Sequence, residues 1–256
     1  PLTDRLNYCS SPINNMGWHM TVEKLLDIEI PKRVQYMRVI VMELARIADH
    51  IICNGILGVD TGAFSGFLYV MQEREFIYEI YEEICGARLT TNIGRIGGFE
   101  RDFNETTFKK IEEFLERYPP VLKEFEELFV RNRIFIERTA GVAGVTPEEA
   151  LEYSWSGPIL RATGVDYDVR VVSPYCSYEE FDFEVPVGTN GDVYDRFMVR
   201  NAEMWQSLSI IRQAMDKIKK EPAGVFHADV PEFYLPPKEQ VYNNMEALIY
   251  HFKIVM

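Results

Sequence analysis

The chain has 256 residues, 47% of them hydrophobic and 26% charged, and its 27 basic and 40 acidic side chains give a net charge of −13. This composition is typical of a globular protein and excludes a disordered chain. The acidic balance argues against binding to nucleic acid, because that affinity comes mainly from Lys and Arg side chains that neutralise phosphates. The same balance disfavours direct electrostatic binding to a membrane surface.

No apolar run approaches the roughly 20 residues that a membrane-spanning helix requires. The cysteines lie tens of residues apart and form no CxxC pair, which favours free thiols in a reducing compartment over disulfides or a zinc site. They are Cys9, Cys53, Cys85 and Cys176. The chain starts without Met and stops inside an apolar, helix-like stretch, so we expect a piece of a longer protein that lacks both termini.

Helical periodicity dominates the first third of the chain. Asn14 or Asn15 is expected to cap a helix that runs to about residue 28. Pro31 suits the first turn of a long second helix. The next helix should run from about residue 63 to 85 and end at Gly86. The break between these two helices is expected around three glycines: Gly55, Gly58 and Gly62.

Helices also dominate the remainder. Asn104 is expected to cap a helix that Pro119-Pro120 divides into a helical hairpin. Thr146 and Glu149 form a capping box. A long helix should occupy about residues 192–220, and a last helix should start near Gln240.

One segment, residues 167–187, has a period of two: Phe181, Phe183 and Val185 alternate with acidic residues. This alternation predicts a short β-hairpin. The fold class predicted from the sequence is therefore mainly α, a helical bundle with one small β-hairpin element, and residues 1–256 are expected to form a single domain.

The sequence has no self-contained catalytic motif: neither HExxH, nor a Walker A loop, nor GxSxG occurs in it. Four polar residues do recur on one face of the long second helix, and they are either a solvated stripe or functional charged groups. These residues are Glu43, Arg46, His50 and Asn54.

Two further side chains leave alternatives open. Asp60 is either a capping residue for the following helix or a buried carboxylate with a raised pKa, because it lies among apolar residues and glycines. Tyr8 is either a core aromatic residue or a hydroxyl donor to a ligand carbonyl.

Several blocks, spread in order along the whole chain, resemble the D-subunit family of the proton-pumping NADH:quinone oxidoreductase, respiratory complex I. They are residues 4–8 (DRLNY), 22–26 (VEKLL), 73–75 (ERE), 86–88 (GAR), 95–98 (RIGG), 160–170 (LRATGVDYDVR), 191–196 (GDVYDR) and 249–253 (IYHFK). That family is similar to the large subunit of [NiFe] hydrogenases, so the resemblance implies an α-helical bundle with small β elements.

The resemblance implies that quinone is reduced between this chain and a neighbouring subunit that holds the terminal [4Fe-4S] cluster. By motif position, Tyr8 matches the tyrosine that hydrogen-bonds the quinone headgroup, and Asp60 matches the aspartate that partners a headgroup histidine and helps to deliver protons. Arg5 matches a basic residue near the cluster interface. Four residues fall at positions that line the quinone pocket: Ser10, Ile52, Phe67 and Met71.

The resemblance also implies the partners of the chain. We expect no cofactor or metal bound by the chain itself and no binding of nucleic acid. Contacts are expected with the B subunit, which holds the terminal cluster, and with the C subunit. The complex would hold the chain at the cytoplasmic face of the inner membrane through its partner subunits, and the isolated chain would be inactive.

The sequence departs from the family pattern at one informative position. Many relatives carry a histidine, associated with redox-linked protonation of the cluster, where this chain has Thr90.

Two alternatives to the complex I family stay open. A [NiFe] hydrogenase large subunit requires two CxxC pairs, which do not occur here. The other alternative is a non-catalytic helical scaffold.

Overall fold

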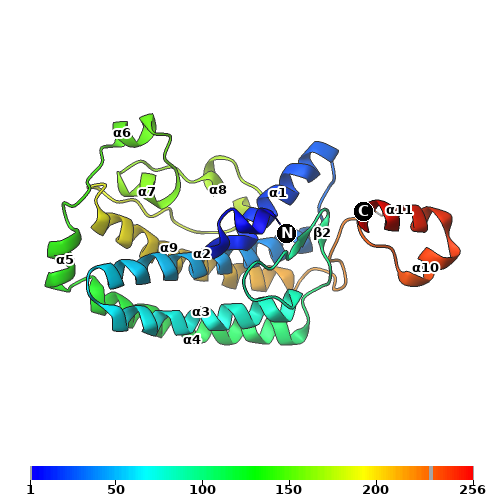
Figure 1. The fold of residues 1–256 in the computed structure, drawn as a ribbon, viewed down its shortest axis with the longest axis horizontal. Coiled ribbons are helices and arrows are strands. Elements are labelled where there is room, and N and C mark those ends of the chain that lie inside the picture. The colour runs from blue at the N-terminus through cyan, green and yellow to red at the C-terminus, as the bar shows by residue number, and fades with distance from the viewer. Residues whose placement is uncertain (1, 231–232, 256) are drawn as a thin grey trace.

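The computed structural model describes residues 2–230 and 233–255. Its four long helices lie side by side in an elongated bundle (Figure 1). They are α2 (Lys32–Asp60), α3 (Phe64–Cys85), α4 (Glu105–Phe129) and α9 (Val193–Ile218). The mainly α fold class is confirmed.

Shorter elements surround this bundle. Helices α10 and α11 project from the end opposite to α5, and α6 and α7 lie together above the α5 end (Figure 1). The short helices are α1 (Ser11–Leu26), α5 (Arg133–Thr139), α6 (Pro147–Glu152), α7 (Gly157–Ala162), α8 (Val169–Val172), α10 (Lys238–Asn243) and α11 (Met245–Val255). Single 3₁₀ turns are η1 (Thr3–Arg5), η2 (Tyr8–Ser10) and η3 (Tyr178–Glu180), and two short strands are β1 (Gly94–Arg95) and β2 (Gly98–Phe99).

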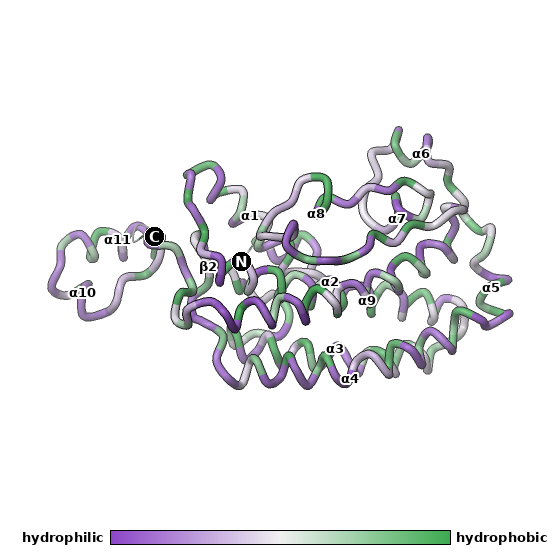
Figure 2. Tube along the Cα trace, turned by 180° about the vertical axis from the view of Figure 1, so that it is seen from behind, coloured by the Kyte–Doolittle hydropathy of each residue, from purple (hydrophilic) through white to green (hydrophobic). Residues whose placement is uncertain are grey.

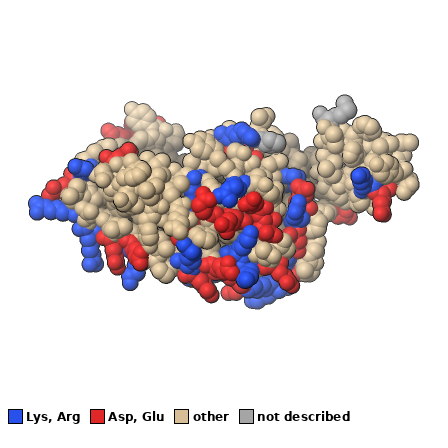
Figure 3. Space-filling model, turned by 60° about the horizontal axis from the view of Figure 1, so that its bottom comes forward, with Lys and Arg blue, Asp and Glu red and all other residues tan. Residues whose placement is uncertain are grey.

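Helix α2 is the central element, because α1, α3 and α9 all pack against it. An unbroken buried stretch, residues 36–45, runs through its middle, as expected for a helix covered on all sides. Hydrophobic and hydrophilic residues alternate along α3 and α4, which bury only one face each (Figure 2). The exposed sides of these two helices carry acidic and basic side chains that are intermixed (Figure 3), with cross-helix pairs such as Lys110–Glu83 at 3.4 Å.

Several predicted helix ends are confirmed. The side chain of Asn104 caps α4 by accepting a hydrogen bond from the Thr107 amide. Thr146 and Glu149 form the expected capping box at α6. Helix α3 ends at Gly86, whose φ of 77° suits a glycine. These signals are local, since each depends on residues within one turn of the helix end.

The first helix begins earlier than predicted. Helix α1 starts at Ser11, with Pro12 in its first turn, so neither Asn14 nor Asn15 is its cap. Instead the side-chain oxygen of Asn15 accepts a hydrogen bond from the Gly94 amide at 2.8 Å. This contact attaches α1 to the small β1–β2 hairpin.

The predicted break between the two helices is confirmed around Asp60 and Gly62, since α2 ends at Asp60 and α3 starts at Phe64. Gly55 and Gly58 take no part in it, because α2 continues through both residues. A Cβ atom at Gly55 would lie 2.8 Å from the ring of Phe67, and one at Gly58 would lie 2.8 Å from the ring of Phe129. The glycines therefore allow aromatic side chains of α3 and α4 to approach the α2 backbone, and they do not end the helix.

The predicted division at Pro119-Pro120 is also wrong, since α4 runs without interruption across both prolines. Pro119 cannot donate to the Leu115 carbonyl, its normal helical partner. Arg212 of α9 donates to that carbonyl instead, at 2.9 Å. Tertiary structure thus supplies the hydrogen bond that the proline removes.

No hairpin forms in residues 167–187, so its predicted position is wrong. The segment is extended after Phe181, but glutamine side chains of α9 take the place of a second strand. Gln213 accepts from the Asp182 amide at 2.9 Å and donates to the Asp182 carbonyl, and Gln206 accepts from the Glu184 amide. The small sheet lies instead at Gly94–Phe99.

Candidate functional site

The sequence-predicted site residues begin in a compact turn, residues 3–10, which we call the Tyr8 turn. It packs against α1 and α2. Tyr8 is 60% exposed and is therefore not a core aromatic residue. Arg5 is also exposed. Ser10 is buried, and its hydroxyl oxygen accepts a hydrogen bond from the side-chain amide of Asn7 at 2.8 Å, so it supports the turn from inside.

Asp4 precedes exposed Arg5 in the same turn but points inward and is fully buried. Burial raises the pKa of its carboxyl group above the ordinary value. Sequence reasoning did not single out Asp4 by itself. Its only signal was membership of the DRLNY block.

The remaining predicted residues lie where α2 and α3 meet. Asp60 is the last residue of α2 and is exposed, so the buried environment required by one alternative is absent. The capping alternative is also wrong, because Ala63 precedes α3 and no side chain caps that helix. Ile52, Phe67 and Met71 are half-buried, and the ring of Phe67 lies against Gly55.

The structure does not bring all of these residues together. The side chain of Asn7 lowers the pKa of the Asp49 carboxylate through a hydrogen bond, so the Tyr8 turn lies beside Asp49 on α2. Asp60 lies eleven residues further, a rise of about 16 Å along the helix. The half-buried pocket residues of α2 and α3 lie between these two levels.

A second, more deeply buried group of polar residues links α2 to α7, α8 and α9. We call it the buried charged network. Its carboxylates are Glu43, Asp168 and Glu203, its guanidinium groups are Arg46, Arg161 and Arg170, and its other members are His50, Tyr178 and Ser207.

Glu43 is the centre of one end of this network. Arg170 and Tyr178 donate to one of its oxygens at 3.2 and 2.6 Å, and Arg46 and Ser207 donate to the other at 3.1 and 2.6 Å. Burial acts to raise the pKa of Glu43, but the two guanidinium groups and the hydrogen bonds lower it to about 2. The carboxylate is therefore ionised and fully paired.

His50 and Glu203 form the other end. His50 Nε2 lies 2.7 Å from Glu203 Oε2, and Arg161 binds the second oxygen of Glu203 through Nε at 2.9 Å and through Nη2. Arg161 also lies 3.7 Å from Asp168, which pairs with Arg170 at 2.6 Å. The chain of contacts is thus continuous from His50 to Glu43.

These contacts rule out one of the two alternatives for the polar face of α2. Glu43, His50 and Asn54 are buried, so the solvated stripe is wrong. The partners on α7, α8 and α9 were not predicted as site residues. One signal was available on α9, because Glu203 and Ser207 begin a row that continues with Ile210 and Ala214, which are buried.

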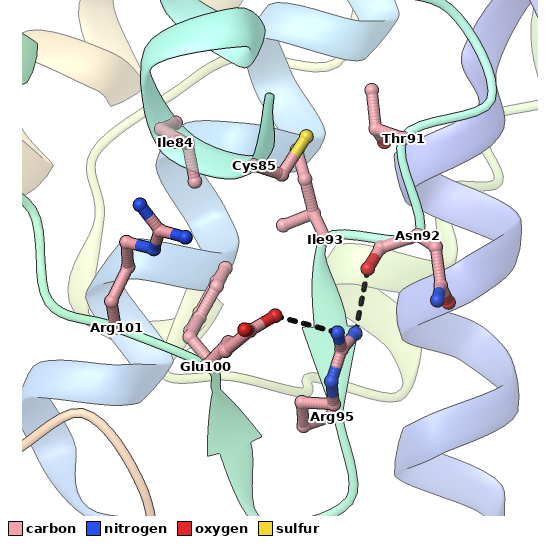
Figure 4. A pocket seen from close by; sticks show the side chains of 9 residues that line it. Ile84, Cys85, Thr91, Asn92, Ile93, Arg95, Glu100 and Arg101 are labelled. Atoms are coloured by element: carbon pink, nitrogen blue, oxygen red, sulfur yellow. Dashed lines mark hydrogen bonds and ion pairs between the residues drawn. The ribbon is translucent and has the colours of Figure 1, made fainter. Parts of the chain in front are cut away.

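A small polar cavity of about 200 Å³ lies beside the β1–β2 hairpin. Arg95 borders it and donates to the Asn92 carbonyl and to Glu100, both at 2.7 Å (Figure 4). The thiol of Cys85 also borders the cavity, and burial raises its pKa. Because Glu100 already pairs with Arg95, the cavity does not present a free cation at that position to an anionic ligand.

Within the described ranges, 2–230 and 233–255, no three or more His, Cys, Asp or Glu side chains come together in a way that suits a metal ion. In the same ranges, none of the helices combines the length and the apolar character needed to cross a bilayer.

Comparison with known proteins gives a consistent result. The family described as "Respiratory-chain NADH dehydrogenase, 49 Kd subunit" matches residues 60–256. The chain is 74% identical over 255 residues to the D subunit, numbered 2, of the NADH-quinone oxidoreductase of Cytophaga hutchinsonii, and the match covers 100% of this chain and 65% of that protein.

Two further relatives extend this similarity. The D subunit of the NADH-quinone oxidoreductase of Flavobacterium johnsoniae is 72% identical, with 100% of this chain and 62% of the relative covered. The D subunit of the Leptospira biflexa enzyme is 54% identical, with 99% of this chain and 62% of the relative covered. The chain thus spans between 62% and 65% of the length of these curated relatives.

Proposed function

Because the chain belongs to the family of the 49 kDa subunit of respiratory-chain NADH dehydrogenase, we propose that it forms a quinone-reduction site with a neighbouring iron–sulfur subunit of an NADH–quinone oxidoreductase. In this proposal, electrons from NADH pass through the iron–sulfur clusters of partner subunits to quinone. The chain itself supplies the walls of the site and the groups that bind the headgroup and move protons.

The observation that carries the proposal is an apolar surface next to Asp60, where α2 meets α3, which we call the apolar corner. It consists of exposed Ile56, Phe64 and Leu68 on α2 and α3, with exposed fractions of 45%, 57% and 55%. Half-buried Ile52, Phe67 and Met71 adjoin it on the same two helices. A surface of this kind is unfavourable in water, so a partner subunit or an apolar ligand is expected to cover it.

A quinone fits this environment for chemical reasons. Its ring and side chain are apolar, whereas its two carbonyl oxygens need hydrogen-bond donors. Tyr8 is exposed beside α2 and supplies a neutral O–H donor. Donors placed in a site that excludes water stabilise the negative charge that develops on the quinone oxygen during reduction.

The two-electron reduction of a quinone to a quinol also consumes two protons. We assign Asp60 to proton delivery, as the carboxylate that partners the headgroup-binding histidine, and Arg5 to the interface with the terminal cluster. A guanidinium group near that cluster favours the extra electron density of its reduced state. Ser10 supports the Tyr8 turn from its buried side.

We also propose partner subunits and a location for the chain. The B and C subunits would cover the exposed apolar surface, and the chain would lie at the cytoplasmic face of the inner membrane through its partners. We also propose that residues 1–256 act as one domain, and that the isolated chain has no quinone reductase activity because the electron donor belongs to another subunit.

The test is Tyr8→Phe in the assembled complex, with Tyr153→Phe as the control because Tyr153 is also exposed but lies on the distant α6 end. We expect Tyr8→Phe to lower NADH:quinone reductase turnover, while NADH oxidation by ferricyanide stays unchanged. Tyr153→Phe should leave both activities unchanged. Normal quinone reduction by the Tyr8 variant would contradict the headgroup assignment.

A further inference from the structure

His50 is held asymmetrically within the buried charged network. Only 4% of the residue is exposed. One ring nitrogen, Nε2, lies 2.7 Å from Glu203 Oε2. The other, Nδ1, is buried without a hydrogen-bond partner and lies 3.8 Å from Asp49 Oδ2. The imidazole therefore has one nitrogen fixed and one nitrogen available.

Glu203 is suited to orient the ring and unsuited to carry a proton. Arg161 binds its second oxygen, and the residue is completely buried. Burial acts to raise the pKa of Glu203, but His50 and Arg161 outweigh it and hold the pKa far below the ordinary value. A permanently ionised carboxylate fixes the N–H of a histidine on the facing nitrogen, so Nδ1 is the nitrogen that stays available.

Nδ1 faces the Tyr8 turn through Asp49. The Asp49 side chain is 22% exposed, and it connects the buried network with the surface. Burial acts to raise its pKa, but His50 and Asn7, the residue before Tyr8, lower it. Asp49 is therefore an ionised acceptor between the available nitrogen of His50 and the turn that carries Tyr8.

We propose that His50 is a buried proton donor and acceptor that supplies one of the two protons of quinone reduction through Asp49. This inference rests on the proposed function and assigns to that site a proton route separate from Asp60. A proton leaves Nδ1 of the His50 imidazolium for the Asp49 carboxylate, and His50 stays neutral with its remaining N–H toward Glu203.

The Asp49 carboxylic acid then gives its proton to an oxygen of the reduced quinone at the Tyr8 turn, and it returns to the carboxylate form. The iron–sulfur cluster of the neighbouring subunit would supply the two electrons one at a time, and the second proton would arrive by the Asp60 route. A proton from water restores the imidazolium. The gap of 3.8 Å between Nδ1 and Asp49 exceeds a hydrogen bond. A bridging water, or a small rotation of the carboxyl group when the site is occupied, closes such a gap.

Charged and titratable groups face this pair from every element packed against it. They are Arg46 on α2, Cys53 on α2, Cys9 in the Tyr8 turn, Arg200 on α9 and Arg161 on α7. Of these, the thiols have pKa values raised by burial, so they stay neutral near pH 7. The cations balance the carboxylates that flank His50.

The test is His50→Gln in the assembled complex. Glutamine keeps a donor for Glu203 but cannot be protonated, so a purely structural role predicts normal turnover. We expect quinone reductase turnover to fall about tenfold, less than the about 10²-fold of a direct general acid, because water still reaches Asp49. The solvent deuterium isotope effect on turnover should change as well, while NADH:ferricyanide activity stays normal.

The matched control is His19→Gln. His19 is another buried histidine, on α1, and it lies outside the buried charged network. This variant should keep the turnover and the isotope effect of the unaltered complex. Equal turnover and an equal isotope effect in the His50 variant would overturn the proposal.

A second variant, Asp49→Asn, tests the proposal if the complex that carries His50→Gln does not assemble. Asp49→Asn lies at the edge of the network, and it should lower turnover and alter the isotope effect in the same direction. Normal values in that variant would also overturn the proposal. The Tyr8→Phe variant distinguishes a failure of the proposed function from a failure of the role of His50. If Tyr8→Phe has normal quinone reductase turnover, the proposed function fails. If Tyr8→Phe is impaired and the His50 and Asp49 variants are normal, only the role of His50 fails.

Discussion

Gly58 of α2 and Phe129 of α4 are packed so closely that a Cβ atom on the glycine would lie 2.8 Å from Cζ of the ring. Gly66 of α3 approaches the same ring, also with 2.8 Å between its Cβ position and Cζ. Phe129 cannot move away, because its ring contacts Phe125 and Phe197 with centroids 4.7 and 5.8 Å apart. The ring of Phe129 therefore packs α2, α3 and α4 together beside the apolar corner.

Gly58→Ala should therefore destabilise the chain. Overpacking costs about 1–3 kcal/mol, whereas the better helix propensity of alanine returns about 1 kcal/mol. We expect a net loss of up to about 2 kcal/mol in the free energy of unfolding, measured by urea denaturation of the full chain.

Gly17→Ala is the matched control for this substitution. Gly17 also lies inside a helix, α1, but nothing lies within 4 Å of its Cβ position. That variant should gain up to about 1 kcal/mol. Equal stabilisation by both alanines would contradict the packing argument.

Replacement of Glu43 tests the energetics of the buried charged network. Glu43→Gln keeps the shape of the side chain but leaves Arg46 without its carboxylate, and Arg170 keeps only Asp168. Breaking one partner of a buried ion pair costs about 3–5 kcal/mol, so we expect a loss of that size in the free energy of unfolding.

An exposed ion pair provides the comparison. Lys109 and Glu113 lie 3.7 Å apart on the surface of α4, with more than half of each side chain exposed. Glu113→Gln should change the free energy of unfolding by less than about 0.5 kcal/mol. If the two glutamine variants lose similar stability, the network is not the source of the expected effect.

The outcomes for the helices show what a sequence can predict. Asn104, Thr146 and Gly86 were assigned correctly because a cap is decided within one helical turn. Pro119 was misread because Arg212 fills its missing role at the Leu115 carbonyl, from a position 97 residues further along the chain than Leu115. Local pattern cannot reveal a partner that only the tertiary fold supplies.

The candidate site also contains residues that the sequence predicts and partners that only the tertiary fold reveals. Regular spacing placed four polar residues on one helix face: Glu43, Arg46, His50 and Asn54. It could not reveal that Glu203, 153 residues away, binds His50 or that Arg161 binds Glu203. The roles proposed for Tyr8 and Asp60 came from the family resemblance, since an exposed residue carries little signal in composition or periodicity.

His19 should make stability depend on pH. Burial lowers its pKa from 6.5 to about 4, with a further contribution from Arg38. The unfolded chain therefore binds a proton below pH 6.5 that the folded chain does not accept until about pH 4. Stability is complete above pH 6.5 and falls as the pH decreases, by about 2 kcal/mol between pH 7 and pH 5.

This dependence is measured by urea unfolding of the full chain at both pH values. His19→Gln removes the titration, so its loss between pH 7 and pH 5 should be smaller by that amount. His251→Gln, on the projecting helix α11, should retain the whole decrease. A His19 variant with the unaltered pH dependence would refute the assignment.

Asp60 allows function to be separated from stability. The residue is exposed at the end of α2, so Asp60→Asn should change the free energy of unfolding by less than about 0.5 kcal/mol. In the assembled complex, the same change should lower quinone reductase turnover by about 10²-fold if the carboxylate delivers protons. Asp216→Asn, at an exposed position of α9, should leave turnover unchanged.

The double variant with His50→Gln then tests whether there are one or two proton routes. Asp60 lies about 16 Å along α2 from the level of Asp49, too far for direct proton transfer between them. Two independent routes predict that removing both lowers turnover further than either single change, whereas residues on one route predict no additional loss. An unimpaired Asp60 variant would remove that residue from the mechanism and leave His50 with Asp49 as the remaining route.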